Sequence, residues 1–326
     1  MNFSICRFGD IARSEWDELF LNSKTRNVFY AWELMRASSH SFESAREAWI
    51  VVGRQEGALK LAQPVRVLRR SGNAVVEFVK VISAEQIEPL GLDNISRRGV
   101  VDLLDFIMKA FSATEVRITA ASERLRQKII ASGISRRVSQ TGKKFGTQIS
   151  MPRSEDEFRA SMKSDHRNLL KRKLRKGDAA GLKFRLISED SGATSEDRQA
   201  ALHRLTELHR KRFDSMEKTS FFVQNDVQRF HAEIAEQGDG SVSFEFIECT
   251  LDETVIGSIY SVATRGEYVC LMTGFDPEHS RLSVGFLLMY RAVLRTIELK
   301  LETFDMKVGA EAYKSWWSQD RYKVYS

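Results

Sequence analysis

The residues of this sequence that are best suited to chemistry lie in a stretch near its C-terminus. An apolar run leads through a polar loop into an amphipathic pattern in GFDPEHSRLSVGFLL, residues 274–288. A helix that begins there presents unpaired backbone N–H groups and a partial positive charge, which suit a pyrophosphate. Gly285 lets a ligand approach the backbone, Ser283 is placed to cap the helix, and Arg281 adds a cation. The loop therefore predicts a site for a phosphate-bearing ligand.

A second group of polar residues follows in ETFDM, residues 302–306, and in KVGAEAYKSWW, residues 307–317. In a mixed sheet, the strand with Asp305 is expected beside the strand that feeds the phosphate loop. Acyl transfer to an amine needs a proton acceptor, a proton donor to the leaving thiolate and hydrogen bonds to the oxyanion. We predict that Asp305 orients or deprotonates the amine, that Tyr313 protonates the thiolate, and that Lys314 holds an anion. A structural alternative is an Asp–Lys pair beside a packed tyrosine.

Short strands and a helix would position these residues. In the second half, alternating or apolar runs separated by the turns LDET and TRGE indicate an antiparallel meander. A helix face and a further strand follow. The segments are Ser243–Cys249, Val255–Ala263, Tyr268–Phe275, the face of Phe286, Tyr290, Val293 and Ile297, and Glu302–Met306.

The first half repeats this order. Its meander, helix face and last strand are Ala48–Gly53, Leu59–Leu68 and Val75–Ile82, then Val100, Leu103, Leu104, Ile107 and Phe111, then Val116–Thr119. The repeat predicts an α/β fold of the α+β, mixed-sheet kind, with two similar domains whose mostly antiparallel sheets carry flanking helices. The domains are expected at 1–150 and 151–326, with Pro152 near the junction. The alternative is an α+β protein in which this order arises by chance.

One basic helix over residues 154–176 is expected to join the halves. Ser154 and Glu157 form a capping-box pattern, and the helix ends in the basic run HRNLLKRKLRKG. Such a run is typical either of a solvated face or of a surface that binds a phosphate-bearing substrate. A second amphipathic helix is expected over 197–213, where it carries LHRKRF.

Composition narrows the class of protein. The 326 residues are 42% hydrophobic and 29% charged, as in ordinary soluble domains, and the net charge of +6 allows an anionic partner. Cys6, Cys249 and Cys270 are too far apart in sequence for a zinc motif or a disulfide framework, so no metal is expected. No apolar run is long enough to span a membrane, and charges interrupt the N-terminus where a signal peptide needs its apolar core. We therefore expect a cytoplasmic protein.

Several segments together resemble a known family. LHRKRF, the pair Phe221-Phe222, GFDPEHSRLSVG, FDMKVGAEAYKSWW and the N-terminal EWDELF…NVFYAWELM look like the CelD/BcsL-like acetyltransferases. These are GNAT proteins of bacterial polysaccharide synthesis, related in fold to the tandem-GNAT Fem transferases. The resemblance implies an acyl-CoA co-substrate, with acetyl-CoA as the leading case, a cofactor loop at 281–286 and catalysis around Asp305, Tyr313 and Lys314. Val284 departs from the family patterns, which place glycine or proline there.

The resemblance and the spacing together give two sets of expected contact residues. The cofactor set is Phe275, Arg281, Ser283, Val284, Gly285 and Phe286, and the acceptor set is His209, Arg212 and Tyr268. In the first half the corresponding loop, residues 82–91, carries Glu85 and Glu88, which would repel a pyrophosphate. We therefore expect a degenerate first domain that shapes the acceptor cleft.

The expected function is acyl-CoA-dependent N-acyltransfer to an amine of an amino sugar or of another small-molecule or glycan envelope precursor. Two alternatives remain open. The first is a Fem-like transferase that uses aminoacyl-tRNA, to which the basic helix over 167–176 would contribute. The second is a non-catalytic nucleic-acid-binding protein that uses the same helix.

Overall fold

The computed structural model describes residues 1–24, 27–70, 72–79, 86–133, 139–237, 240–309, 311, 313–318 and 320–326. The chain forms two compact units. The first consists of Met1–Gly146 together with Arg321–Ser326, and the second of Thr147–Asp320. The sequence placed the division at 150, whereas the structure places it after Gly146 and returns the C-terminal strand to the first unit.

The first unit is built on a five-stranded sheet with the order β1-β2-β3-β4-β5. The strands are β1 (Asn2–Cys6), β2 (Trp49–Gln55), β3 (Ala58–Arg70), β4 (Asn73–Phe78) and β5 (Ala113–Arg117). Neighbours pair antiparallel except β4 and β5, which are parallel. Of the strand expected over 75–82, residues 80–82 lie outside the described residues. The strand expected at 116–119 begins earlier, because Ala113 already pairs with Ala74.

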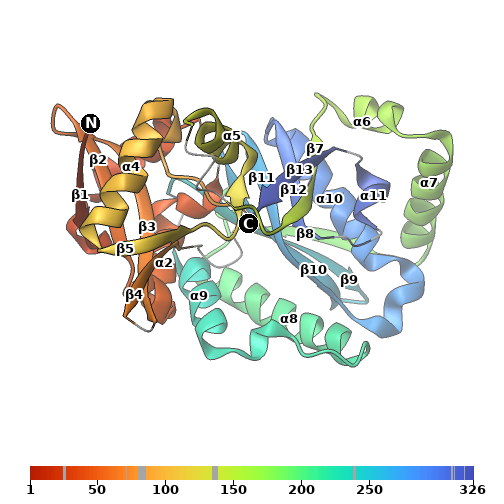
Figure 1. Ribbon diagram of the computed structural model, residues 1–326. Helices are drawn as coiled ribbons and strands as arrows, with labels where there is room; N and C mark the ends of the chain where they lie inside the picture. The colour runs from red at the N-terminus through yellow and green to blue at the C-terminus, as the bar shows by residue number, and fades with distance from the viewer. Residues whose placement is uncertain are drawn as a thin grey trace. The chain divides into compact units, whose positions relative to one another are not determined.

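Helices flank the sheet of the first unit (Figure 1). They are α1 (Arg13–Asn22), α2 (Trp32–Ser41), α3 (Glu43–Arg46), α4 (Arg97–Ala110) and α5 (Glu123–Ala131), with short 3₁₀ helices at Phe8–Asp10, Val28–Tyr30 and Leu92–Asn94. Helix α4 buries Val100, Leu103 and Ile107, the face that the sequence predicted. Its N-terminus is capped by Ser96, whose Oγ accepts from the Gly99 N–H at 3.1 Å.

The second sheet has the order β6-β13-β7-β12-β11-β10-β9-β8. Its strands are β6 (Ala121–Ser122), β7 (Lys143–Ser150), β8 (Lys183–Ile187), β9 (Ser243–Leu251), β10 (Thr254–Thr264), β11 (Glu267–Phe275), β12 (Thr303–Val308) and β13 (Arg321–Tyr325). Strand β8 pairs antiparallel with β9, β9 with β10, and β10 with β11. Strand β11 pairs parallel with β12. Both β6 and β13 belong to the first unit, and the division between the units falls within β7.

Helices cover both faces of the second unit's sheet. They are α6 (Glu155–Ser161), α7 (Ser164–Ala179), α8 (Ser195–Asp214), α9 (Asn225–Glu236), α10 (Val284–Glu298) and α11 (Lys314–Trp317), with 3₁₀ helices at Phe221–Val223 and Pro277–Leu282. Helix α8 packs on β10 and β11 from one side and α10 packs from the other (Figure 1). None of the helices within the described ranges is long and apolar enough to cross a membrane.

The single basic helix predicted over 154–176 is two helices. The chain leaves helical geometry at Met162 (φ −73°, ψ 149°) and Lys163 (φ −60°, ψ 151°). Ser164 and Asp165 then place a polar and an acidic residue in a new first turn, where both are favourable. Helix α7 continues past Gly177, which is buried, and a Cβ there would lie 3.0 Å from Leu287 Cδ1. Glycine thus permits close packing of α7 and α10.

The two units share one order of elements, as the sequence predicted. Each has a first strand, two or three helices, a three-stranded antiparallel meander, a long helix and a last strand parallel to the third strand of the meander. These are β1 to β5 with α4 in the first unit, and β8 to β12 with α10 in the second. The fold is therefore a mixed α/β fold with two mixed sheets and flanking helices.

Candidate functional site

The parallel strands β11 and β12 part halfway along their length. Their ladder covers only Glu267–Val269 against Thr303–Asp305. Lys307 then takes a left-handed backbone conformation with φ +66°. Asp305 Oδ1 accepts a hydrogen bond from the Lys307 N–H at 2.7 Å, so this carboxylate holds the bend. Beyond this point, residues 270–275 of β11 and 306–308 of β12 form no ladder with each other, and we call this region the strand opening.

A bulge in β11 lies beside the strand opening. In the ladder with β10, Ser261 pairs with Cys270 and Tyr260 pairs with Met272, so Leu271 is the extra residue. A bulged residue leaves its backbone group outside the regular ladder. Bulge backbone N–H groups can donate to an oxygen that gains negative charge during acyl transfer.

Helix α10 begins just after β11, where its N-terminus has no side-chain cap. Ser283 occupies the N-cap position with φ +60° and ψ 37°, and its side chain makes no capping bond. The Phe286 and Leu287 N–H groups both donate to the Ser283 carbonyl, at 3.0 and 3.1 Å. The N–H groups of Val284 and Gly285 precede the first bonds that the helix can make for itself. The predicted cap position is correct, but the left-handed backbone turns the hydroxyl away from these donors.

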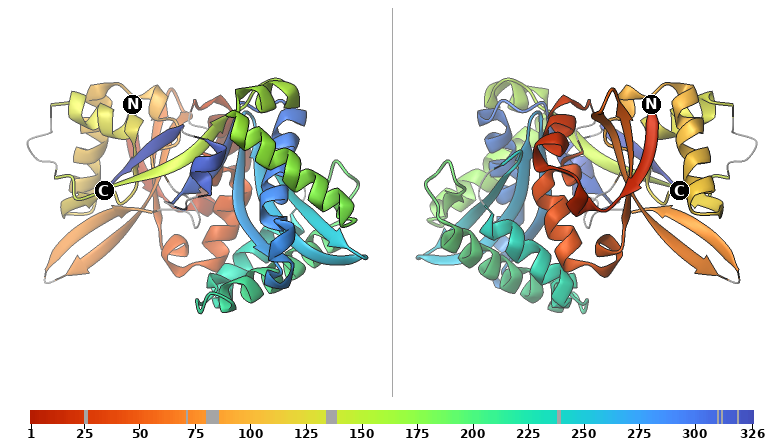
Figure 2. Two further views of the ribbon diagram at one scale, coloured as in Figure 1. Left: turned by 90° about the vertical axis from the view of Figure 1, so that its right-hand side faces the viewer. Right: turned by 90° about the vertical axis from the view of Figure 1, so that its left-hand side faces the viewer.

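Lys173 of α7 occupies the space to which Ser283 turns. Its Nζ donates to Ser283 Oγ at 2.7 Å and lies 4.7 Å from the centre of the Phe286 ring. Burial lowers the Lys173 pKa, and the neighbouring cations Arg172 and Lys176 lower it further. Helix α7 runs beside α10 in both orientations of the molecule (Figures 1 and 2). The basic helix therefore brings one ammonium group to the uncapped end of α10.

The predicted cofactor residues occupy different positions around this helix end. Val284 is 1% exposed, and its side chain packs over Gly257 of β10. A Cβ at Gly285 would lie 3.2 Å from the Phe275 ring, which explains why glycine fits there. Arg281 is exposed in the 277–282 turn. Phe286 packs in edge and tilted contacts with the two tryptophans of α11.

Tyr313 precedes α11 and lies among polar residues at the strand opening. Its side chain is 46% exposed. Burial of the hydroxyl raises the Tyr313 pKa, Cys270 and Glu311 raise it further, and Arg212 opposes them. Asp305, in turn, acts electrostatically on Cys270. A tyrosine with a raised pKa stays protonated at neutral pH and can donate a proton.

Arg212 of α8 closes the other side of this group. Its guanidinium lies 4.7 Å from the centre of the Phe275 ring, and Nη1 donates to the Thr273 carbonyl at 3.4 Å. Burial lowers the Arg212 pKa. Asp305, Tyr313, Arg212 and Phe275, which the sequence analysis assigned to the catalytic, acceptor and cofactor sets, thus lie around the strand opening.

Lys314 does not point into this site. It is 4% exposed, and its Nζ donates to the carbonyls of Lys307 and Val308, both at 3.2 Å. Glu311 pairs with the same ammonium group at 3.0 Å. An ammonium with these partners has no donor left for a ligand. The expected anion contact is therefore corrected to a structural role at the end of β12.

His209 and Tyr268 are also buried, where they cannot contact an acyl-acceptor substrate. Tyr268 is 0% exposed beneath α10, and its hydroxyl donates to Glu245 at 2.9 Å. His209 is 3% exposed, stacks on Phe213, and its Nδ1 lies 2.9 Å from Ser220 Oγ. Burial lowers the His209 pKa to about 4, so its ring is neutral. Alternation along β11 and helical spacing along α8 place both side chains in the core. The expected contacts of His209 and Tyr268 with the acceptor substrate are therefore corrected to core packing.

Lys173 and Cys270 were not predicted as site residues, although a signal for Lys173 exists. His166, Leu170, Lys173 and Gly177 recur at spacings of four, three and four, the inward face of a helix. The surrounding cations hide that pattern in the sequence. Cys270 is 9% exposed, as expected of a core cysteine, and nevertheless lies beside Tyr313.

The loop of the first unit differs from the prediction. Glu88 is 4% exposed, bonds to Ser122 and pairs with Arg124 at 3.5 Å, so it is buried within its own unit. Glu85 lies outside the described residues. Within the described residues no group of three or more His, Cys, Asp or Glu side chains could hold a metal ion.

Comparison with known proteins finds a family model that matches part of the chain. A family model described as the acetyltransferase (GNAT) domain matches residues 164–315. None of the curated protein sequences matches the chain.

Solved structures share the fold over nearly the whole chain. FemX is similar at a TM-score of 0.67 and 10% identity, covering 100% of this chain and 97% of FemX. A conserved Bacteroides thetaiotaomicron protein of unknown function gives 0.61 at 10% identity, covering 97% and 98%. The C-terminal domain of a putative Agrobacterium fabrum lysylphosphatidylglycerol synthetase gives 0.58 at 12%, covering 96% and 91%. The likeness to these structures shows the fold, and the acetyltransferase (GNAT) match over residues 164–315 lies within the second unit.

Proposed function

We propose that the second unit is an acyl-CoA-dependent N-acyltransferase, with acetyl-CoA as its expected co-substrate. One observation carries this proposal. The same end of β11 presents an uncapped helix N-terminus, where Lys173 adds a cation, and the strand opening beside Tyr313. A phosphate-bearing thioester needs both features, an anion site for its phosphates and a space where its acyl group meets an amine.

In this proposal the Val284 and Gly285 N–H groups, Lys173 and Arg281 bind the pyrophosphate. The bulge at Leu271 donates a backbone hydrogen bond to the thioester oxygen, which gains negative charge as the amine attacks. Tyr313 gives its proton to the sulfur as the carbon–sulfur bond breaks. Asp305 orients the amine or takes its proton, while it also fixes the bend at Lys307.

The proposed acceptor is an amine of an amino sugar or of another envelope-polysaccharide precursor. Support for this class comes from the resemblance of LHRKRF and FDMKVGAEAYKSWW to acetyltransferases of polysaccharide synthesis. Arg212, partly buried beside Phe275, is the side chain best placed to contact an acceptor that carries negative charge.

Acetyl-CoA binding to Gly285 variants tests the proposal. Gly285→Glu places a carboxylate at the anion site and should weaken binding about 100-fold or more. Gly285→Ala adds the same Cβ, 3.2 Å from Phe275, without the charge, and should weaken binding much less. Isothermal titration on folded variants gives both affinities. Equal affinities for acetyl-CoA in the wild type and in folded Gly285→Glu would refute the proposed site.

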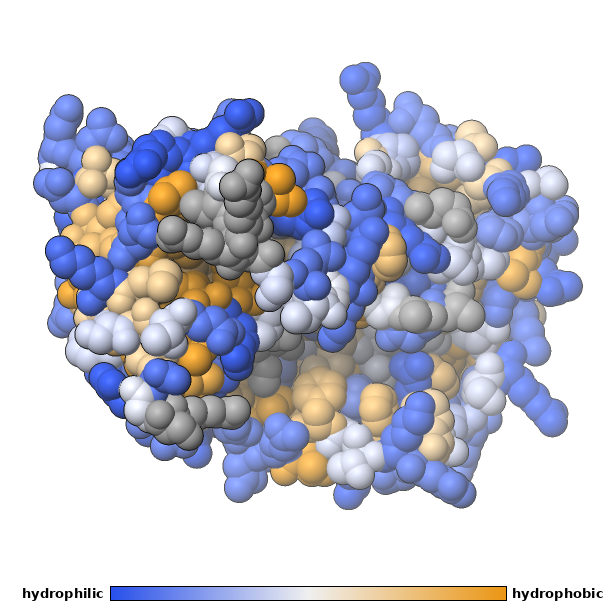
Figure 3. All heavy atoms as spheres, viewed as in Figure 1, coloured by the Kyte–Doolittle hydropathy of each residue, from blue (hydrophilic) through white to orange (hydrophobic). Residues whose placement is uncertain are grey.

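A second candidate is a Fem-like transferase that uses aminoacyl-tRNA. It is favoured by the outer face of α7, where Lys171, Arg172, Arg175 and Lys176 are exposed and form no ion pair within the described ranges. The surface over α6 and α7 is mostly hydrophilic (Figure 3). Charged tRNA should then raise the thermal unfolding midpoint and acetyl-CoA should not. Stabilisation by any nucleic acid, with a steep salt dependence, would instead indicate non-specific binding.

A further inference from the structure

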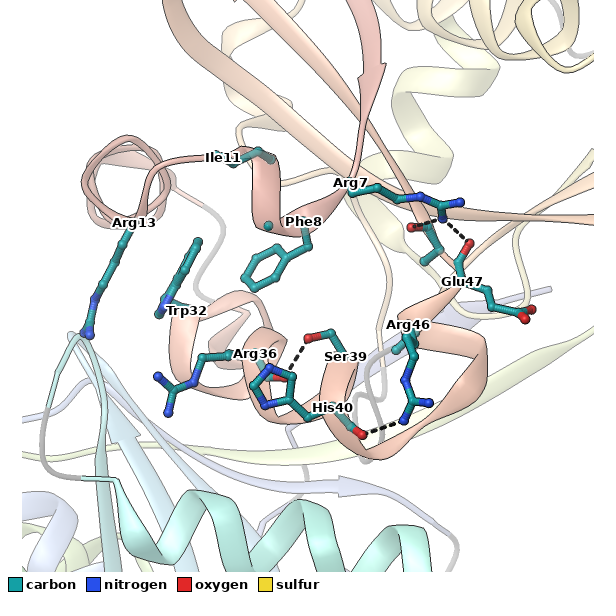
Figure 4. Close-up of a pocket in the computed structure, with 13 residues that line it drawn as sticks. Arg7, Phe8, Ile11, Arg13, Trp32, Arg36, Ser39, His40, Arg46 and Glu47 are labelled. Carbon is teal, nitrogen blue, oxygen red and sulfur yellow. Dashed lines mark hydrogen bonds between the residues drawn. The ribbon is translucent and has the colours of Figure 1, made fainter.

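The first unit contains a pocket that acyl transfer in the second unit does not use. Its cavity measures about 910 Å³ and is lined by the end of β1, the 8–10 turn, the start of α1, the outer face of α2, and α3 with the residues after it (Figure 4). All of its lining residues belong to the first unit. The volume is that of a site for a small organic molecule.

Two aromatic rings form one side of this pocket and are held rigidly. Phe8 and Trp32 lie 4.5 Å apart, centre to centre, with their planes 34° apart. Behind them Trp16 is fully buried and makes an edge contact with Phe8 at 5.2 Å. The Trp16 Nε1–H donates to the Tyr30 carbonyl at 2.7 Å, which fixes the support. A preformed aromatic face of this kind suits the flat or apolar side of a ring.

The opposite side of the pocket carries two guanidinium groups. Arg7 and Arg46 lie there, across from Trp32 (Figure 4). Arg7 donates through Nη1 to the carbonyls of Glu47 and Ala48, at 2.7 and 3.1 Å, and Arg46 donates through Nη2 to the His40 carbonyl at 2.8 Å. Neither forms an ion pair with a side chain in the described residues. Each guanidinium therefore keeps its charge and further N–H donors for a ligand.

The other charged residues of the pocket contribute less. Arg13 pairs with Asp17 at 3.1 Å and with Glu33 at 2.5 Å, so its charge is compensated. Arg36 already takes part in an interaction within the chain. The Glu47 side chain points away from the ring pair in Figure 4.

Arg7 is also preorganised. Its guanidinium stacks 3.4 Å from the centre of the Trp49 ring, while its two carbonyl bonds fix the plane of the group. A guanidinium fixed in this way loses little entropy when it binds a phosphate through two parallel N–H groups. Phosphate is an anion whose oxygens match the parallel N–H donors of a guanidinium.

We propose that this pocket binds a small organic phosphate whose ring lies on Phe8 and Trp32 and whose phosphate lies between Arg7 and Arg46. A sugar phosphate and a nucleoside monophosphate share this chemistry, and the test distinguishes them. The proposal does not depend on acyl transfer by the second unit.

Titration of the full-length protein with matched pairs of compounds tests this site. The pairs are glucose 6-phosphate with glucose, and uridine 5′-monophosphate with uridine. At least one phosphorylated member should bind ten-fold or more tightly than its neutral partner, and should change the fluorescence of Trp32. Whichever pair responds identifies the ring as a sugar or a nucleoside.

Variants then locate the binding. Arg46→Ala and Arg7→Lys should each weaken binding of the phosphate about ten-fold, because each removes charge-assisted hydrogen bonds. Arg98→Ala is the matched control, because Arg98 is exposed and pairs with Asp102 outside the pocket. Gly285→Glu should leave this binding unchanged, which separates the pocket from the acetyl-CoA site. Failure of all phosphorylated probes to bind, or full affinity in folded Arg46→Ala and Arg7→Lys, would overturn the proposal.

Discussion

Each unit has a pair of parallel strands joined by a helix. The two strands stay paired in the first unit and part in the second. In the first unit β4 and β5 pair from Ala74–Glu77 to Ala113–Arg117, nearly the whole of both strands. In the second unit the ladder between β11 and β12 stops at Val269. Strands that stay paired leave no room for a ligand between them, whereas strands that part expose backbone groups and side chains along both edges.

The helices that follow differ in the same sense. Ser96 caps α4 and uses its hydroxyl to satisfy the Gly99 N–H. Ser283 leaves the first N–H groups of α10 uncapped and contacts Lys173 instead. An unsatisfied helix end costs stability, which a bound anion restores. Topology alone therefore does not identify a ligand site, because the ladder and the cap decide whether it exists.

Loss of the Tyr313 hydroxyl should give the largest effect, on catalysis. Removal of a general acid costs about 10²–10⁴-fold in rate, so Tyr313→Phe should lower kcat by that factor and leave acetyl-CoA affinity unchanged. The matched control is Tyr325→Phe, which removes a hydroxyl that interacts with Glu123 in the first unit and should leave kcat unchanged. Steady-state kinetics with an amino-sugar acceptor measure both. A normal kcat in folded Tyr313→Phe would assign the tyrosine to packing alone.

Acid should destabilise the second unit before the first. Burial lowers the pKa of His209 to about 4 and that of His231 to about 3. Below an unfolded value of about 6.5 the unfolded chain therefore binds protons that the folded unit does not, and stability falls as pH falls from about 6.5 towards 4. For His209 the full loss is about 3 kcal/mol. The first unit has only His40, which is exposed.

Hydrogen exchange resolved by peptide, at pH 7 and pH 5, separates the two units. Peptides of α8 and α9 should lose protection at pH 5 before those of α1 and α4. His231→Leu should reduce this pH dependence, because it removes one of the two titrating rings. The substitution loses no hydrogen bond, since neither ring nitrogen of His231 has a partner in the described residues. Equal loss of protection in both units would contradict the prediction.

Much of the fold could be predicted because hydrophobic alternation reports which side of a strand is buried. The repeated meander and the helix that follows it depend on such local patterns. The bend at Lys307 could not be predicted, since it depends on a left-handed residue that is not glycine. Tyr268 shows the same limit within the site, because alternation predicts burial on one face of β11 only once that face is known to lie under α10.

The pocket of the first unit was missed for a different reason. Arg7, Trp32 and Arg46 come from three separate elements, and no spacing in the sequence connects them. Lys173 was hidden among neighbouring cations, although its helical position marks it as inward. Residues that meet only in the tertiary structure can be predicted from the sequence only when the periodicity of each element shows which of its faces is buried.

The smallest expected effects come from the two serines at the helix ends, and they separate stability from binding. Ser96→Ala removes a capping bond and should cost about 1 kcal/mol, which lowers the unfolding midpoint by about 2–4 °C in a unit of this size. It should leave acetyl-CoA affinity unchanged. Ser283→Ala has no capping bond to lose, so its stability should change by less than about 0.5 kcal/mol. It removes the partner that positions Lys173 and should weaken acetyl-CoA binding a few-fold. Calorimetry and titration of both variants decide the matter: a destabilised Ser283→Ala with normal affinity would make α10 an ordinary capped helix like α4, and the contrast between the units would then rest on the strand opening alone.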